Sequence, residues 1–183
     1  PSESLTSAPK KKLSKRLTPR LKSVMDLHCL GHVNLDLGTD HAHLPMLLVK
    51  SNKSPIAFGV DIAESPLKHA YQELKKTNTL ENIALVLSNG IEAFTSAVTP
   101  FKSSSNSVVH SFSQASWNQW EQLKKEKKIT VTICGVGGAL AAELIQQLPT
   151  WISEIIVQAN DQEYLVDEAF AELAKSDSLD DSS

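Results

Sequence analysis

The residues with the clearest chemical meaning form a short acidic turn after an apolar run. Asp36 and Asp40 flank Gly38, which is the only glycine of this turn. A dinucleotide dehydrogenase needs several glycines here, because its pyrophosphate must approach the backbone and the helix N-terminus. Two carboxylates repel phosphate but attract a cation, such as a sulfonium that also carries an ammonium group. The turn therefore predicts a cationic cofactor, and the lack of a G-x-x-x-x-G-K-[ST] loop excludes a P-loop site.

Polar residues also end the next two predicted strands. Asp61 follows the first turn by about twenty residues, where nucleoside-binding sheets place the acceptor for ribose hydroxyls. An Asp at a strand end is more often a helix cap or turn former, but its spacing from Asp36 favours a functional role. The next strand ends in Asn89 and Gly90. The amide of Asn89 suits an adenine edge, and a plain Asn-Gly turn explains it equally well.

Three glycines follow the fourth predicted strand, namely Gly135, Gly137 and Gly138. Glycines so close together after a β-branched strand indicate positive φ angles or a close approach of the backbone to a ligand. A tight turn is the alternative, and it explains one glycine better than three. We therefore expect this turn to belong to the binding site.

Other catalytic chemistries find little support. His28, Cys29 and His32 precede the first strand and His41 and His43 follow it, but their spacing matches no zinc motif. We therefore expect no metal. No G-x-S-x-G elbow is present, so the sequence does not favour nucleophilic hydrolysis.

The elements that must position these residues alternate between strands and helices. Strands are expected at 33–37, 56–62, 83–87, 129–134 and 154–158. Helices are expected at 13–29, 42–49, 65–76, 90–98, 139–148 and 164–174, and the fourth of these is opened by Gly90. Ser65 and Pro66 are expected to be the N-cap and first residue of the third helix. Such β-α units predict an α/β fold with a doubly wound, mostly parallel sheet, whose ligands bind beyond the carboxyl ends of the strands.

A polar segment at 100–128 interrupts this alternation, with a helix expected around 117–125, and we expect the segment to lie outside the core. Its aromatic residues Phe112, Trp117 and Trp120 suit stacking on nucleic-acid bases beside the nearby lysines. We favour instead that they anchor the insertion to the surface of the domain.

Bulk composition predicts one core in a soluble, cytoplasmic protein. The chain has 183 residues, of which 41% are apolar, and contains no run of eighteen apolar residues and no secretory h-region. We expect a disordered basic extension at 1–12, a domain at 13–175 and a disordered acidic tail at 176–183. The basic head suits a polyanion such as RNA, although a solvated terminus is the simpler explanation.

Six motifs occur in the same order as in a known family. They are LSKRL at 13–17, DLGTDHAHLP at 36–45, GVDIAESPL at 59–67, NGIE at 89–92, ICGVGG at 133–138 and IVQAN at 156–160. Together they resemble the TrmK family of bacterial tRNA (adenine-22-N1)-methyltransferases. The resemblance implies a Rossmann-like class I methyltransferase that binds S-adenosylmethionine and methylates tRNA. Enzymes of this family continue past their fifth strand, so we expect a fold truncated after strand five.

The resemblance also implies roles for individual residues. Cofactor-binding roles fall to Asp36, Gly38, Asp40, Asp61, Asn89, Gly90 and Gly135, and substrate-binding roles to Lys12, Lys15, Arg16, Gly137 and Gly138. Asp40 is the candidate for stabilising the cationic methylated base. His41 is either a proton relay or a cap on the following helix, and we favour the cap slightly.

Some positions depart from the family pattern. Ser88 and Asn89 replace a glycine and an acid, His43 replaces a tyrosine, and Ala159 replaces a proline. Two alternatives therefore stay open, a non-catalytic RNA-binding or assembly protein with a degenerate methyltransferase fold, and a methyltransferase of small molecules. The oligomeric state is also open.

Overall fold

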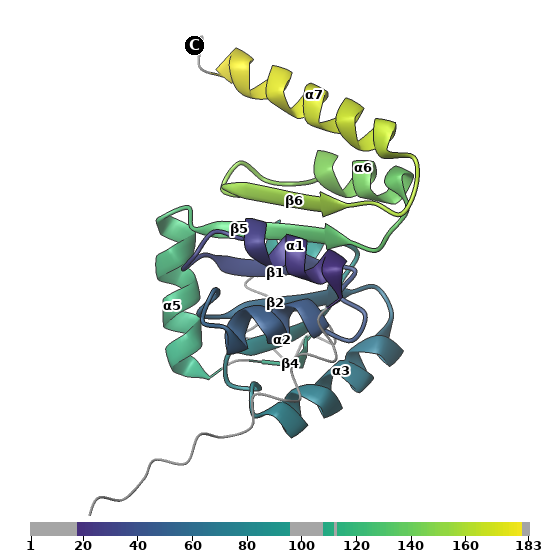
Figure 1. The fold of residues 1–183 in the computed structure, drawn as a ribbon. Helices are drawn as coiled ribbons and strands as arrows, with labels where there is room; N and C mark the ends of the chain where they lie inside the picture. Colours follow the sequence, from purple (N-terminus) through teal and green to yellow (C-terminus); the bar gives the residue numbers. More distant parts are fainter. Residues whose placement is uncertain (1–17, 96–107, 112, 181–183) are drawn as a thin grey trace, which may run out of the picture.

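The computed structural model describes residues 18–95, 108–111 and 113–180, which form an α/β fold around one six-stranded sheet (Figure 1). The strand order is β4-β3-β2-β1-β5-β6. The strands are β1 (Val33–Leu37), β2 (Ala57–Asp61), β3 (Ile83–Leu87), β4 (Val108–His110), β5 (Ile129–Cys134) and β6 (Glu154–Gln158). All neighbouring strands pair in parallel except β3 and β4, which are antiparallel. The predicted doubly wound, mostly parallel sheet is confirmed.

Helices cover both faces of the sheet, which explains why its central strands are buried along nearly their whole length. They are α1 (Pro19–Leu27), α2 (His43–Lys50), α3 (Glu64–Thr77), α4 (Glu92–Thr95), α5 (Gln114–Lys125), α6 (Gly138–Gln146) and α7 (Glu163–Asp180). The first three pack on one face, which is the front in Figure 1. Residues of the last four form the core on the other face with Leu35, Phe58 and Val131.

The segment at 100–128 is where the sequence prediction was wrong. Within its described part, β4 extends the sheet and α5 contributes to the core. Trp120 is only 3% exposed, and its ring lies 4.9 Å from that of Phe58 and 6.1 Å from that of Trp151. Ser116, Trp120 and Leu123 recur at helical spacing, so one face of this otherwise polar helix is buried. Trp120 is therefore too deeply buried to stack on a nucleic-acid base, whereas Phe112 lies outside the described residues.

Several helix boundaries differ from the prediction. Helix α2 is shifted by one residue, α6 ends two residues earlier, and α4 begins at Glu92, so Gly90 does not open it. Helix α3 begins at Glu64 after the N-cap Ala63, so Ser65 is not its N-cap. The side chain of Asp61 sets this start, because its Oδ1 accepts a hydrogen bond of 2.9 Å from the N–H of Ala63. The expected start of the first helix at 13 lies outside the described residues, within which α1 begins at Pro19 after the N-cap Thr18. Helix α7 continues beyond the expected end at 174, where no glycine or proline stops it.

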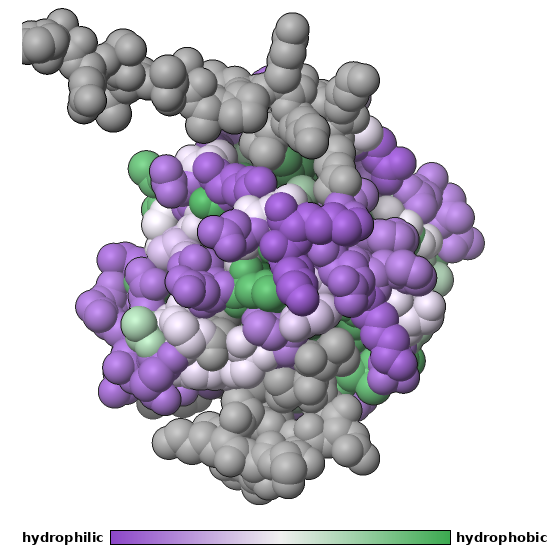
Figure 2. All heavy atoms as spheres, turned by 90° about the horizontal axis from the view of Figure 1, so that it is seen from below, coloured by the Kyte–Doolittle hydropathy of each residue, from purple (hydrophilic) through white to green (hydrophobic). Residues whose placement is uncertain are grey.

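The face of the molecule opposite the top of Figure 1 is mostly polar. Figure 2 shows the molecule from below, where hydrophilic residues dominate and apolar spots are small and separate. None of the helices that the structure describes combines the length and apolar character needed to cross a membrane.

Candidate functional site at the carboxyl edge of the sheet

The turns that follow β1, β2, β3, β5 and β6 meet at one edge of the sheet, because these five strands run in the same direction. The arrowheads of β5 and β6 point to this edge in Figure 1. Open α/β sheets bind their ligands there. Most of the candidate site residues predicted from the sequence lie in these turns. Lys12, Lys15 and Arg16 are the exceptions, since they lie outside the described residues.

Asp36 lies beneath the first turn and is almost fully buried. Its Oδ2 accepts a hydrogen bond from the hydroxyl of Thr39, and its Oδ1 accepts one from Thr132 on β5, both at 2.7 Å. The Thr132 hydroxyl in turn accepts from the amide of Asn34 at 3.0 Å. Burial raises the pKa of Asp36 to about 6, while the two hydroxyls oppose this rise and the charge of Asp61 adds to it. The carboxylate therefore holds the turn from below.

The turn itself has an unusual backbone. Gly38, Asp40 and Ala42 all have positive φ angles, of 75°, 52° and 53°. The left-handed region is open to glycine but costs other residues roughly 1 kcal/mol, with Asp tolerated better than Ala. Two hydrogen bonds of 2.9 Å, from the N–H groups of Gly38 and Thr39 to the carbonyl of Val60, fix the turn against β2. Backbone strain of this kind concentrates at functional sites.

Asp61 connects the first and second turns. Its Oδ2 accepts a hydrogen bond of 3.1 Å from the N–H of Asp40, while its Oδ1 holds the start of α3 at Ala63. A carboxylate has about four acceptor positions, so Asp61 keeps capacity for ligand hydroxyls. The side chain of Asp40 is 69% exposed. The structure thus brings Asp40 and Asp61 together, and the carboxylate of Asp40 is open to solvent.

His41 does not cap the following helix. The N-cap of α2 is Ala42, and no side chain caps this end. Instead, Nδ1 of His41 lies 2.8 Å from Oδ1 of Asp40. Its ring also stacks between His43 and His69, with centroids 5.8 and 5.7 Å away. The capping role that we favoured is therefore wrong, and His41 instead orients the carboxylate of Asp40.

The third turn is tied to the second. The N–H of Ser88 donates to the carbonyl of Asp61 at 2.9 Å, and the Ser88 hydroxyl accepts from the N–H of Ala93 at 3.1 Å. Asn89 is exposed, and its Nδ2 donates to Oε1 of Glu92 at 3.1 Å. Gly90 has a φ of 54°, a left-handed conformation that favours glycine, and a Cβ there would displace Cδ2 of Leu144.

The glycines after β5 have different surroundings. Gly135 is exposed with a φ of 77°, and no atom would contact a Cβ added there. Gly137 is the N-cap of α6, and a Cβ on it would lie 3.1 Å from Oδ1 of Asp161. Gly138 is buried, and a Cβ on it would lie 2.3 Å from the carbonyl oxygen of Gln162. Gly135 is therefore open to a ligand, whereas Gly138 lets the turn after β6 pack against α6.

The sequence prediction missed the residues that close this edge from the side. Arg20 on α1 donates from Nε to Oε1 of Gln158 at 2.9 Å and from its guanidinium to Oδ1 of Asn160 at 2.8 Å. The side chain of Asn160 donates in turn to the carbonyl of Gly135 at 2.6 Å. Asp161 accepts from the N–H of Gly138 at 3.0 Å. Asn160 and Asp161 come directly after β6, and this position was the signal that could have identified them.

Known proteins are similar to this chain in sequence and in fold. The family described as Methyltransferase domain matches residues 17–109. The tRNA (adenine(22)-N(1))-methyltransferase of Bacillus subtilis strain 168 is 25% identical over 131 residues, which are 72% of this chain and 43% of that protein. The structure of M. capricolum TrmK with S-adenosyl-homocysteine is 30% identical, with a TM-score of 0.59, over 79% of this chain and 53% of that one.

The fold of B. subtilis TrmK is also similar, with a TM-score of 0.62 and 23% identity over 85% of this chain and 56% of that one. The chain thus spans about half the length of these relatives. The resemblance to the TrmK family that the motifs predicted is confirmed. The family match covers just over half of the chain, at residues 17–109, so the chain belongs to the methyltransferase domain family.

Proposed function

We propose that this chain is a single methyltransferase domain that uses S-adenosylmethionine to methylate N1 of an adenine in tRNA. The observation that carries the proposal is the pair of acidic turns joined by the hydrogen bond from Asp40 to Asp61 at the carboxyl edge. M. capricolum TrmK, the similar protein solved with S-adenosyl-homocysteine, supports the choice of cofactor. The B. subtilis relative, a tRNA (adenine(22)-N(1))-methyltransferase, supports the choice of substrate.

The charges of the site fit a cationic cofactor. Asp36, Asp40 and Asp61 follow or end two neighbouring strands, and Arg20 is engaged by Gln158 and Asn160. Such a cluster of carboxylates attracts a sulfonium and an ammonium group and repels the phosphates of a dinucleotide. The edge therefore fits S-adenosylmethionine better than a dinucleotide.

Each predicted position has a role in this proposal. Asp61 holds the ribose hydroxyls with its spare acceptor positions, and Asn89 beside Gly90 faces the adenine. Gly38, Asp40 and the exposed Gly135 surround the methionine part, and Asp36 supports the turn from below. Gly137 and Gly138 shape the floor on which the target base rests.

The chemistry requires mainly positioning. Bound S-adenosylmethionine supplies a methyl group on a positively charged sulfur. The in-plane lone pair of adenine N1 attacks this carbon as the carbon–sulfur bond breaks, so sulfur loses its charge and the base gains it. Asp40, oriented by His41, stabilises the new cation. The target base must leave its stack to reach the edge, and the basic residues Lys12, Lys15 and Arg16 would hold tRNA phosphates. A tRNA substrate would place the protein in the cytoplasm.

The test is incubation with unmodified tRNA and S-adenosylmethionine, followed by mass spectrometry of the nucleosides. We expect 1-methyladenosine with the unaltered chain and none with Asp40→Ala. Asp26→Ala is the matched control, because Asp26 is an exposed acid on α1 that pairs with Lys22. Equal product from Asp40→Ala would contradict the role of this carboxylate.

The two alternatives give different results in the same assay. A chain that binds the cofactor but leaves both tRNA and metabolites unmodified would be a non-catalytic RNA-binding or assembly protein. Turnover of a metabolite without 1-methyladenosine would indicate a small-molecule methyltransferase.

A further inference from the structure

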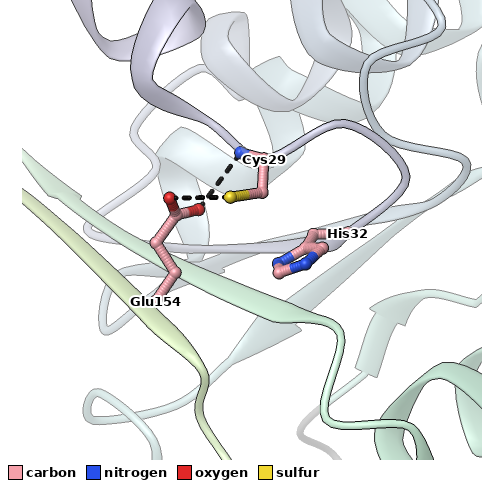
Figure 3. Close-up of side chains that lie close together, drawn as sticks. All are labelled: Cys29, His32 and Glu154. Atoms are coloured by element: carbon pink, nitrogen blue, oxygen red, sulfur yellow. Dashed lines mark hydrogen bonds between the residues drawn. The ribbon is translucent and has the colours of Figure 1, made fainter.

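A second cluster of reactive side chains lies at the opposite edge of the sheet, where the parallel strands begin. Cys29 is in the loop after α1, His32 directly precedes β1, and Glu154 is the first residue of β6 (Figure 3). One ligand atom from each residue lies within 4.8 Å of the other two. This cluster takes no part in the proposed methyl transfer.

Glu154 is the centre of the cluster. Its Oε1 accepts a hydrogen bond from the Cys29 thiol at 3.1 Å, and its Oε2 accepts from the N–H of Cys29 at 3.2 Å. Thr130 on β5 also donates its hydroxyl proton to Oε2. The Glu154 carboxylate is therefore held in place from two sides.

The same network fixes the tautomer of His32. Its Nδ1 lies 3.1 Å from Oγ1 of Thr130. The only hydroxyl proton of Thr130 is donated to Glu154, so Nδ1 must be the donor and Nε2 carries the lone pair. Hydrogen bonds of this kind orient the histidine and carboxylate ligands of metal sites.

We propose that Cys29, His32 and Glu154 form a zinc-binding site that is separate from the cofactor edge. Thiolate, imidazole and carboxylate are the three ligand types that Zn²⁺ accepts, and a thiolate disfavours Mg²⁺ and Ca²⁺. Tetrahedral zinc places its ligand atoms about 3.5 Å apart. The exposed side chain of Cys29 can provide the small movement that this requires. On binding, zinc replaces the thiol proton, which is released to solvent.

His28 is a second, independent observation at this place. It is only 3% exposed, and neither ring nitrogen has a hydrogen-bond partner of good geometry within the described part of the chain. It directly precedes Cys29 in the chain. Buried polar groups rarely stay without partners. Three protein ligands leave the fourth coordination position of zinc to a water molecule. The O–H groups of water can donate a hydrogen bond to the unprotonated nitrogen of the His28 ring.

The site would join segments that are distant in the sequence. Cys29 and Glu154 are 125 residues apart, and zinc would fasten the loop after α1 to β6. The opposite end of α1 is held to the turn after β6 by Arg20. The sequence predicted no metal, because Glu154 gave no sign of its proximity to Cys29 and His32.

Metal titration of the metal-free chain tests the proposal. We expect one Zn²⁺ per chain by calorimetry, and Co²⁺ should give thiolate charge-transfer absorption in the near ultraviolet. Cys29→Ser, His32→Ala and Glu154→Gln should each weaken zinc binding at least tenfold, and Cys29→Ser should abolish the charge-transfer band. The matched controls are Cys134→Ser and His69→Ala, because burial raises the pKa of the Cys134 thiol to about 12 and His69 lies on α3.

The outcomes are decisive whether or not the methyltransferase proposal holds, since the readout is metal binding alone. Absence of binding, or a charge-transfer band that persists in Cys29→Ser, would overturn the site. Equal losses in the control variants would do the same. Circular dichroism checks that each variant is folded. If Cys29→Ser or His32→Ala perturbs the loop, Glu154→Gln still tests the site, because glutamine keeps one acceptor oxygen and the shape of the side chain.

Discussion

Replacing Asp36 by Asn should change how stability depends on pH. Burial raises the pKa of Asp36 from its ordinary value of 3.8 to about 6 in the folded state. The folded chain therefore binds the Asp36 proton more tightly than the unfolded chain does. This preference stabilises the fold fully at a pH below the pKa of the unfolded chain, and the stabilisation is lost as pH rises through the pKa of the folded chain. At about 1.4 kcal/mol for each tenfold change in proton affinity, the loss amounts to about 3 kcal/mol.

Urea unfolding of the unaltered chain and Asp36→Asn between pH 4 and 7.5 measures this contribution. The free energy of unfolding of the variant minus that of the unaltered chain should rise by about 2.4 kcal/mol across this range, because other titrating groups cancel and about 0.6 kcal/mol of the total is already lost at pH 4. Asp26→Asn is the control, since a hydrogen bond from Lys22 lowers the pKa of Asp26 and its difference curve should not rise. A curve for Asp36→Asn that is flat or falling would refute the reasoning.

Three further results are expected. Affinity for S-adenosylmethionine should fall as pH decreases through about 6, and calorimetry should show this dependence reduced in Asp36→Asn, because only the ionised carboxylate attracts the cation. Gly138→Ala should lower the free energy of unfolding by about 2 kcal/mol in urea, since its Cβ would collide with the carbonyl of Gln162, and an unchanged value would contradict this packing. Trp120→Ala should cost about 3–5 kcal/mol in the same measurement, whereas a loss below about 1 kcal/mol would show that α5 is not part of the core.

Four strands were predicted from the sequence with the bounds that the structure has, namely β1, β3, β5 and β6. Buried or partly buried apolar residues recur through each of them, and turn or polar residues follow. Strand β4 escaped prediction because its three residues lie beside a polar segment. Helix α5 is polar on most of its surface, so its single buried face gave a weak signal.

The residues of the site were easier to find than their contacts. Asp36, Asp40 and Asp61 were identified from their places at strand ends. The bond from Thr132 to Asp36 depends on the pairing of β1 with β5, which joins residues 96 apart and cannot be read from local spacing. Arg20 was not singled out from the sequence, because only the folded chain places α1 beside the turn after β6.

Calorimetric titration with S-adenosylmethionine tests the central claim most directly. We predict saturable binding at a single site in the unaltered chain, at least tenfold weaker binding in Asp61→Ala, and unchanged binding in Asp26→Ala. No heat of binding at millimolar cofactor, or equal affinity in Asp61→Ala, would contradict a cofactor site at the carboxyl edge of the sheet.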